Sequence, residues 1–205
     1  MKDKYHAPFA EGHFYHIFNR GNNKENIFFK QENYRYFLVK FDEYVSDFLE
    51  VYAFCLLPNH FHFLARLKEN LAGFKNLQGL GSSNTRCPIA QAFSNFFNCY
   101  TKAINRQEDR TGSLLQKNFK RILIDKEEYL LHLVWYIHNN PVHHKICNRL
   151  DVYKWGSYNR ILDDRPSKLM KKEVFELFGD KQQYIQFHQR DEIDFEGFGK
   201  YLMEE

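Results

Sequence analysis

The sequence lacks the features of an exported or membrane-embedded protein. Its four cysteines show no Cys-x-x-Cys spacing, which argues against a zinc ribbon, and a chain of 205 residues gives no support to a disulfide framework. No run approaches the roughly 20 apolar residues that a membrane helix requires. The first residues also lack the apolar region of a secretion signal. We therefore expect a cytoplasmic protein with reduced thiols and no membrane partner.

A strong excess of charge of either sign is also missing. The formal net charge is only +3, which many enzymes share and which is weak evidence for a nucleic-acid partner. Basic residues do concentrate at 102–121 and 165–172. Aromatic residues, by contrast, are abundant, with 21 Phe and 13 Tyr. This composition suits a large core and also a surface on which bases could stack.

Residues 54–65 predict a strand, a tight turn and a second strand. The turn is Leu-Pro-Asn at 57–59, in which proline presets one dihedral angle and asparagine tolerates the left-handed region. Because side chains alternate along a strand, His60 and His62 face one side and the phenylalanines at 61 and 63 face the other. Two adjacent imidazoles supply two thirds of a divalent-metal site. Alternatively, two histidines fall by chance on a polar sheet face.

A second informative segment, residues 129–142, carries apolar residues at helical spacing. We expect Asp125 to cap this helix and Pro141 to end it. Tyr136 and Asn140 are four residues apart and therefore share a face. The amide oxygen of Asn140 is a ligand that hard cations accept, and the phenol of Tyr136 can attack once it is deprotonated. Taken alone, a tyrosine on such a helix is most often a packing residue.

Together these motifs resemble a known family. The His-Phe-His sequence at 60–62 is similar to the His-hydrophobic-His motif of HUH endonucleases, and residues 136–142 resemble the catalytic-tyrosine helix of single-tyrosine transposases. The closest resemblance is to the REP-associated tyrosine transposases. Residues 16–28 are similar to the opening strand of that subgroup, and residues 155–158 to its Trp-x-Ser-Tyr segment. The resemblance covers residues 13–160.

The resemblance implies a DNA transposase that cleaves and rejoins single-stranded DNA, with hairpin DNA as its partner. It implies that Tyr136 attacks the scissile phosphate and forms a 5′-phosphotyrosine. It also implies that His60, His62 and Asn140 hold one Mg²⁺ or Mn²⁺. Related members use Gln at the position of Asn140, whose shorter side chain requires the helix to lie closer to the sheet. The chain would act as a monomer or a homodimer.

Polar and basic residues near two strand ends are candidates for DNA contacts. The loop 20–24 could donate hydrogen bonds to phosphate oxygens, although it could also be an ordinary turn. Residues 114–124 read as a basic strand interleaved with aromatic residues, which suits a phosphate-tracking surface or simply a solvated sheet edge. The predicted DNA-binding residues are Arg20, Asn22, Lys117, Lys120 and Arg121.

The expected elements follow one another as strand, helix, strand, strand, helix, strand and helix. They lie at 13–19, 31–48, 49–56, 60–67, 88–107, 114–124 and 129–140, with two short helices at 171–178 and 180–190. This order predicts an α+β fold of ferredoxin-like (RRM-like) type, an antiparallel sheet with helices mainly on one face.

We predict a transposase domain over residues 1–164 and a C-terminal helical extension over 165–205. Residues 68–87 are rich in glycine and serine and predict a long flexible loop. Residues 191–205 are acidic, and we expect them to fray.

Three other functions remain compatible with the sequence. A metal-dependent nuclease that uses water would keep cleaving DNA after Tyr136→Phe. A non-catalytic regulatory protein derived from a transposase would bind single-stranded DNA without cleaving it, even without both histidines. A purely structural protein would require that His60, His62, Tyr136 and Asn140 coincide by chance.

Overall fold

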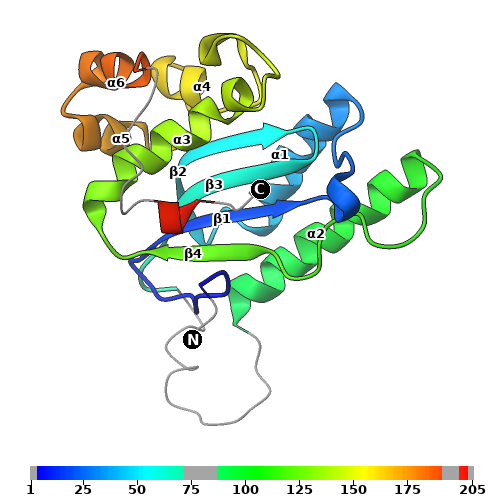
Figure 1. Ribbon diagram of the computed structural model, residues 1–205. Helices are drawn as coiled ribbons and strands as arrows, with labels where there is room; N and C mark the ends of the chain where they lie inside the picture. The colour runs from blue at the N-terminus through cyan, green and yellow to red at the C-terminus, as the bar shows by residue number, and fades with distance from the viewer. Residues whose placement is uncertain (1–3, 72–86, 191–198, 203–205) are drawn as a thin grey trace.

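A computed structural model of the protein describes residues 4–71, 87–190 and 199–202 (Figure 1). Within these ranges, the strands form one four-stranded antiparallel sheet in the order β2-β3-β1-β4. The strands are β1 (Phe14–Arg20), β2 (Leu49–Leu57), β3 (His60–Leu67) and β4 (Lys120–Ile124). The predicted ferredoxin-like α+β class is confirmed, and the histidine strand β3 is one of the two inner strands of the sheet.

One face of the sheet is covered by α1 (Gln31–Tyr44) and α2 (Pro88–Gln107), and the interface is largely aromatic. The ring of Phe63 stacks on Phe41 with centroids 4.4 Å apart, and the ring of Phe61 lies 5.1 Å from Phe37. Both strand phenylalanines are fully buried or nearly so. These rings anchor β3 against α1.

The opposite face is covered by α3 (Leu130–His143), so helices lie on both faces rather than mainly on one (Figure 1). Strand β2 explains this difference, because it is buried along both sides, and a strand buried on two faces needs two covering layers. The cluster around α3 also includes α4 (Tyr158–Leu162), α5 (Lys171–Phe178) and α6 (Lys181–His188). The short 3-10 helices are η1 (Asn22–Lys24), η2 (Glu127–Tyr129), η3 (Leu150–Val152) and η4 (Gly199–Tyr201).

The loop after β1 is held against the turn that precedes the histidines. The backbone N–H of Gly21 donates to the carbonyl of Asn59 at 2.8 Å, and the N–H groups of Ile27 and Phe28 both donate to the carbonyl of Pro58. A Cβ on Gly21 would lie 2.0 Å from the carbonyl oxygen of Glu25, so only glycine fits there. This close packing places the end of β1 beside the start of β3.

Two predicted element ends were wrong. The strand expected at 114–124 covers only 120–124, and Asn118 has a positive φ of 62°, which is incompatible with a regular strand. Helix α1 ends at Tyr44 rather than at 48. The hydroxyl of Ser46 donates to the carbonyl of Asp42 at 2.7 Å and so satisfies a backbone acceptor at the helix end.

The expected boundaries of α3 also need correction. Pro141 lies inside α3, which continues to His143, because a proline in the last turn removes only one hydrogen bond. Asp125 does not cap the helix, since η2 precedes α3 and begins after Lys126. The carboxylate of Asp125 instead accepts a hydrogen bond from the hydroxyl of Tyr201.

The C-terminal region contains the two short helices that the sequence predicted, now seen as α5 and α6. Tyr201 is 1 % exposed, so this residue of the tail that was expected to fray is packed. The remaining residues of the expected loop and tail, at 72–86, 191–198 and 203–205, lie outside the described residues. In the described part of the chain, no helix is long and apolar enough to span a bilayer. The proposed domain boundary at 164 stays a prediction.

Candidate catalytic and metal site

The alternation of β3 brings His60 and His62 together on the face that α3 covers. Their ring centroids are 5.1 Å apart, and they lie opposite Arg20 and Phe18 in the register with β1. His60 is 2 % exposed and His62 is fully buried. The site is therefore enclosed, and every polar atom in it requires a partner or carries a cost in free energy.

A chain of hydrogen bonds determines which nitrogen of His62 carries the proton. The Nδ1 atom of His16 lies 2.6 Å from the carbonyl oxygen of Tyr201, which can only accept, so His16 donates from Nδ1. In a neutral ring, the Nε2 atom of His16 is then an acceptor, and it lies 2.9 Å from Nδ1 of His62. His62 therefore donates from Nδ1 and keeps a lone pair on Nε2. This Nε2 atom is buried and has no hydrogen-bond partner.

His60 is oriented in the same way by its neighbour in the turn. The side-chain nitrogen of Asn59 donates to the carbonyl of Lys24 at 3.1 Å, which leaves the amide oxygen of Asn59 to face His60. This oxygen accepts from Nδ1 of His60 at 2.6 Å. The Nε2 atom of His60 therefore also carries a lone pair, and it too is buried without a partner.

Asn140 presents a third acceptor from α3. Its side-chain nitrogen donates to the backbone carbonyl of Tyr136 at 2.7 Å, and its oxygen is buried without a partner. Burial, the largest effect, lowers the pKa of His60, and the neighbouring Asn140 side chain acts on that pKa in the opposite direction. Thus the atoms expected from the sequence to hold a metal ion are three buried acceptors with unused lone pairs.

These three atoms fit a divalent cation. An unsatisfied buried polar group costs about 1–3 kcal/mol, and a cation would satisfy all three at once. Histidines that donate from their other nitrogen are typical of metal ligands. Among the described residues, no group of three His, Cys, Asp or Glu side chains could hold a metal ion. A metal here would therefore need the Asn140 amide, a combination that allows Mg²⁺ or Mn²⁺.

Burial keeps these imidazoles neutral at physiological pH. It lowers the pKa of His16 to about 4 and the pKa of His62 well below the ordinary value of 6.5. The pKa of His60 is lowered to about 3, first by burial and then by the positive charges of His144 and Arg20. A neutral imidazole can coordinate a metal without first losing a proton.

Tyr136 lies beside this cluster on the same face. Its ring centroid is 5.7 Å from that of His62 and 6.1 Å from that of His16, in both cases edge to face. The structure therefore brings together Tyr136, Asn140 and both histidines, as the sequence predicted. Their catalytic and metal-binding roles stay predictions.

Comparison with known proteins points to the same group of enzymes. No family model matches the chain. A protein of Haemophilus influenzae named as a REP-associated tyrosine transposase is 28% identical over 116 residues, which cover 54% of this chain and 60% of that relative. The chain resembles REP-associated tyrosine transposases.

A solved structure has the same fold. It is a REP-associated tyrosine transposase bound to a REP hairpin, with a TM-score of 0.59 and 18% sequence identity. The match covers 78% of this chain and 85% of that one. At this identity the likeness establishes the fold alone.

The residues predicted to bind DNA do not form one patch. Arg20 and Lys120 lie on the face of the sheet that α3 covers, and Lys120 lies over the rings of Tyr5 and Phe18. Arg121 faces the other side, where its Nε donates to the carbonyl of Ala7 at 2.6 Å and braces the N-terminal segment. The exposed Lys117 and the half-buried Asn22, which donates to Ser113, lie near the loop that precedes β4.

Sequence reasoning missed the residues that orient the histidines. His16 stands four residues before Arg20 in β1, and its strand position alone predicts that it shares a face with Phe18. That signal could have placed it near β3. The carbonyl of Tyr201 is 185 residues from His16, and no local pattern predicts this contact.

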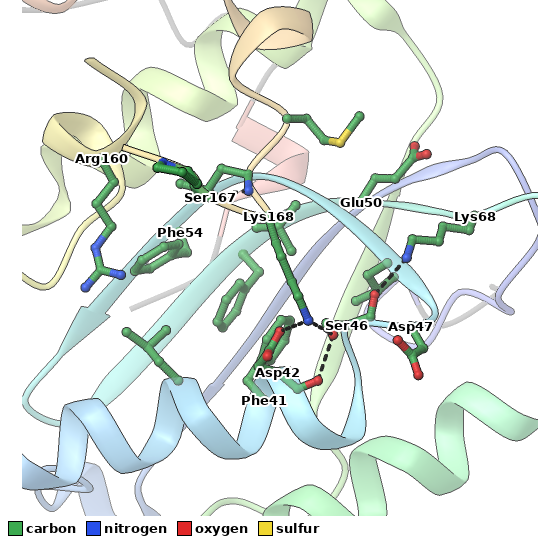
Figure 2. Close-up of a pocket in the computed structure, with 17 residues that line it drawn as sticks. Phe41, Asp42, Ser46, Asp47, Glu50, Phe54, Lys68, Arg160, Ser167 and Lys168 are labelled. Carbon is green, nitrogen blue, oxygen red and sulfur yellow. Dashed lines mark hydrogen bonds and ion pairs between the residues drawn. The ribbon is translucent and has the colours of Figure 1, made fainter. Parts of the chain in front are cut away.

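A separate cavity of about 870 Å³ lies between α1, β2 and residues 166–170, and none of the predicted site residues lines it (Figure 2). Its floor is apolar, and its rim carries Asp42, Glu50 and Lys168. Lys168 pairs with Asp42 at 2.6 Å and donates to the hydroxyl of Ser46. Lys168 is thus already engaged within the protein.

Proposed function

We propose that this protein is a transposase-like strand transferase that cleaves and rejoins single-stranded DNA, with Tyr136 as the nucleophile. The observation that carries the proposal is the position of Tyr136 beside three enclosed, lone-pair-bearing atoms of His60, His62 and Asn140. The name of the curated relative supports the class of reaction. The solved neighbour, which is bound to a REP hairpin, supports hairpin-forming DNA as the partner.

In the proposed reaction, the phenolic oxygen of Tyr136 bonds to the scissile phosphorus. The bond from phosphorus to the 3′ oxygen breaks, the 3′ oxygen leaves as a hydroxyl, and the phenolic proton is lost to solvent or a base. The product is a 5′-phosphotyrosine ester. Because this ester conserves the energy of the phosphodiester, a second 3′-hydroxyl can displace Tyr136 and rejoin the strands. Attack by water would instead break the DNA irreversibly.

His60 and His62 through Nε2, and Asn140 through its amide oxygen, would hold one Mg²⁺ or Mn²⁺. When bound, the ion would neutralise negative charge that develops on the phosphate. The chain itself contributes three things. Hydrogen bonds fix which side-chain nitrogen of each of the three residues donates, so that the other atom is left as an acceptor. Burial excludes water from these acceptor atoms and keeps the imidazoles neutral.

Arg20 supplies a positive charge at the edge of this site. It lies opposite His60 in the sheet register, and its charge lowers the pKa of both site histidines. A phosphate near the histidines would therefore experience an attractive field from Arg20. We assign Arg20 to phosphate binding and orientation rather than to bond making.

The test is covalent capture of DNA. Single-stranded DNA from the flanks of the gene is incubated with Mn²⁺ or Mg²⁺ and wild-type protein, Tyr136→Phe or Tyr129→Phe. The last variant is the matched control, since it makes the same chemical change just before α3. A denaturing gel should show a protein–DNA adduct for wild type and Tyr129→Phe and none for Tyr136→Phe.

Two results would reject this function. Cleavage by wild type and Tyr136→Phe alike, without an adduct, would indicate a nuclease that uses water. DNA binding without cleavage by any of the proteins, over several flanking sequences, would indicate a regulatory binding protein.

A further inference from the structure

Three buried polar side chains on the α3 side of the sheet have no role in the proposed chemistry. They are His138 in α3, Ser157 just before α4 and His188 in α6, and all three are almost completely buried. His138 and Ser157 lie within the two segments, 136–142 and 155–158, that resemble tyrosine transposases. Buried polar groups destabilise a fold unless they are hydrogen-bonded, so their partners indicate what these residues do.

The three side chains form one chain of hydrogen bonds, which we call the His138 network. The Nδ1 atom of His188 lies 2.8 Å from the carbonyl oxygen of Tyr184, which can only accept, so His188 donates from Nδ1. Burial lowers the pKa of both imidazoles and keeps them neutral. The Nε2 atom of His188 therefore accepts from Nδ1 of His138 at 2.9 Å. The Nε2 atom of His138 in turn accepts from the hydroxyl of Ser157 at 2.6 Å.

One end of the His138 network is bound to the sheet. The hydroxyl oxygen of Ser157 accepts from the backbone N–H of Phe54 at 2.8 Å, and the N–H of Ser157 donates to the carbonyl of Phe54 at 2.9 Å. Phe54 belongs to β2, and the next residue, Cys55, lies opposite His62 in the register with β3. Ser157 is thus fixed to the strand that pairs with the histidine strand.

The other end of the network lies on α6, which Figure 1 shows on the far side of α3 from the sheet. The ring of Tyr184 stacks on that of Tyr158 with centroids 5.5 Å apart, and the ring of His188 lies 4.3 Å from that of Tyr184. These contacts hold the acceptor nitrogen of His188 in place. His138 is therefore hydrogen-bonded on both sides, to a residue bound to the sheet and to α6.

The position of His138 on α3 lets the network set the orientation of the helix. At about 100° per residue, His138 lies roughly 200° around the helix from Tyr136, whereas Asn140 lies only about 40° from Tyr136. The hydrogen bonds thus act on the side of α3 away from the nucleophile and the amide ligand. The apolar contacts of α3 are not directional, but hydrogen bonds require alignment of their atoms. The network therefore restricts rotation of α3 about its own axis.

The helix is weakened close to Asn140, which makes this support useful. Pro141 lies inside α3 and has no N–H, so the carbonyl of Ile137 lacks the donor that a regular helix supplies. The missing hydrogen bond spans the turn that contains both His138 and Asn140. The His138 network holds that turn through side chains instead.

The pair of Ser157 and His138 resembles a nucleophile with its general base, but it is not placed for catalysis. Ser157 has no exposed surface, and its oxygen already accepts a hydrogen bond from the backbone. A substrate carbonyl or phosphate cannot approach a hydroxyl that is enclosed in this way. The arrangement suits a positioning role instead.

We propose that His138, Ser157 and His188 are positioning residues, which hold α3 so that Tyr136 and Asn140 face the histidines of β3. This inference rests on the proposed function for the role of Tyr136. It gives α6, in the predicted C-terminal extension, a part in the reaction that it exerts through α3. Such a role has measurable consequences, because a displacement of about 1 Å can slow an enzyme about a hundredfold.

The test breaks the His138 network at each end and compares the result with two matched changes. His188→Leu removes the acceptor for His138, and Ser157→Ala removes the donor to it. His188→Gln is the conservative variant, because its side-chain oxygen can replace Nε2 as an acceptor. Val174→Ala is the control for lost stability, since this buried residue of α5 packs in the same cluster but is not part of the network. Thermal midpoints are measured first, and all assays are run where every variant is folded.

Hydrogen exchange followed by mass spectrometry shows whether the network fixes α3. Exchange in peptides from residues 130–143 is expressed relative to that in peptides from α1. We expect it to be about ten-fold faster in His188→Leu and Ser157→Ala than in Val174→Ala. His188→Gln should resemble wild type. Equal relative exchange in all four variants would overturn the inference.

The rate of covalent adduct formation at saturating single-stranded DNA shows whether this orientation serves the reaction. His188→Leu and Ser157→Ala should react about ten-fold more slowly than wild type with unchanged DNA affinity, because the reacting atoms are displaced while the binding surface is kept. His188→Gln and Val174→Ala should react about as fast as wild type. A network that is merely structural would slow His188→Leu and Ser157→Ala no more than Val174→Ala, and that result would reject the positioning role.

The two readouts separate this inference from the proposed function. If wild type forms no adduct with any DNA, the proposed chemistry fails, and hydrogen exchange still decides whether the His138 network fixes α3. If wild type forms the adduct and the broken networks react equally fast, the proposed chemistry stands and the positioning role is rejected.

Discussion

The two faces of β3 differ more than any other pair of regions in the molecule, although their residues alternate along one strand. On one face Phe61 and Phe63 are surrounded by rings from α1 and α2. On the other face His60 and His62 are equally buried, but each keeps a nitrogen without a partner. The phenylalanine face stabilises the folded state. The histidine face holds buried polar atoms that destabilise the folded state until a ligand binds them.

Magnitudes support this division. Burying a phenylalanine side chain stabilises a fold by about 1.5–3 kcal/mol. A buried polar atom without a partner costs about 1–3 kcal/mol. The buried phenylalanines on one face thus offset the free-energy cost of the unpaired polar atoms on the other face. Such a pattern is expected at functional sites. Four predictions test this difference, beginning with the largest expected effect.

The aromatic face should be the main source of stability. We expect Phe63→Ala to lower the free energy of unfolding by about 3–5 kcal/mol, since it leaves a cavity against Phe41. Urea unfolding followed by circular dichroism measures this loss. Phe29→Ala, at a ring that is 39 % exposed, is the control and should cost much less. A loss below about 1 kcal/mol for Phe63→Ala would contradict the assigned role of this face.

The α3 side should make stability depend on pH through its buried histidines. His188 donates from Nδ1 to the carbonyl of Tyr184 at 2.8 Å, so its Nε2 accepts from Nδ1 of His138 at 2.9 Å. Burial lowers the pKa of His188 to about 4. Between pH 6.5 and 4 the unfolded chain binds a proton that the folded chain does not, so the folded state loses stability as pH falls through this window. The full loss from this group is about 3 kcal/mol.

His188→Gln removes that titrating group and keeps a polar side chain. Urea unfolding of the metal-free protein at several pH values should show a shallower decline for the variant than for wild type, by about 3 kcal/mol over the window. Identical pH profiles would show that His188 is not held neutral by the fold.

The third prediction concerns the side-chain oxygen of Asn140 in α3, a buried acceptor without a hydrogen-bond partner. Asn140→Leu conserves side-chain size and removes a buried oxygen without a partner. Without metal the variant should be as stable as wild type or about 1 kcal/mol more stable. Wild type should gain about 2.7 kcal/mol at a hundredfold excess of Mn²⁺ over its dissociation constant, and the variant should not. Thermal unfolding with and without Mn²⁺ decides this, and an equal gain in both proteins would remove Asn140 from the ligand set.

The smallest effect is expected at the C-terminal turn. Tyr201 contributes its backbone carbonyl to His16 and its hydroxyl to the exposed Asp125. Tyr201→Phe should therefore lower stability by only about 1 kcal/mol and leave the stabilisation by Mn²⁺ unchanged. Loss of the Mn²⁺ effect, measured in the same thermal assay, would mean that the side chain rather than the carbonyl positions His16.

The sequence alone predicted the elements and residues whose evidence is local. Alternation placed His60 and His62 on one face of β3, and a four-residue spacing placed Tyr136 and Asn140 on one face of α3. These predictions succeeded because strand and helix periodicity depend only on neighbouring backbone geometry. The order of the elements then sufficed to predict a ferredoxin-like antiparallel sheet.

Only the tertiary structure decided the rest, because the deciding contacts join residues far apart in the chain. Residues 114–116 are held by hydrogen bonds to the end of β1 and the loop after it, and they do not form part of the strand that local propensity predicted. The protonated nitrogen of His62 is set by His16 and, through it, by a carbonyl 185 residues away. Local patterns determined which side chains could meet, and long-range packing determined which of their atoms were left with unused lone pairs.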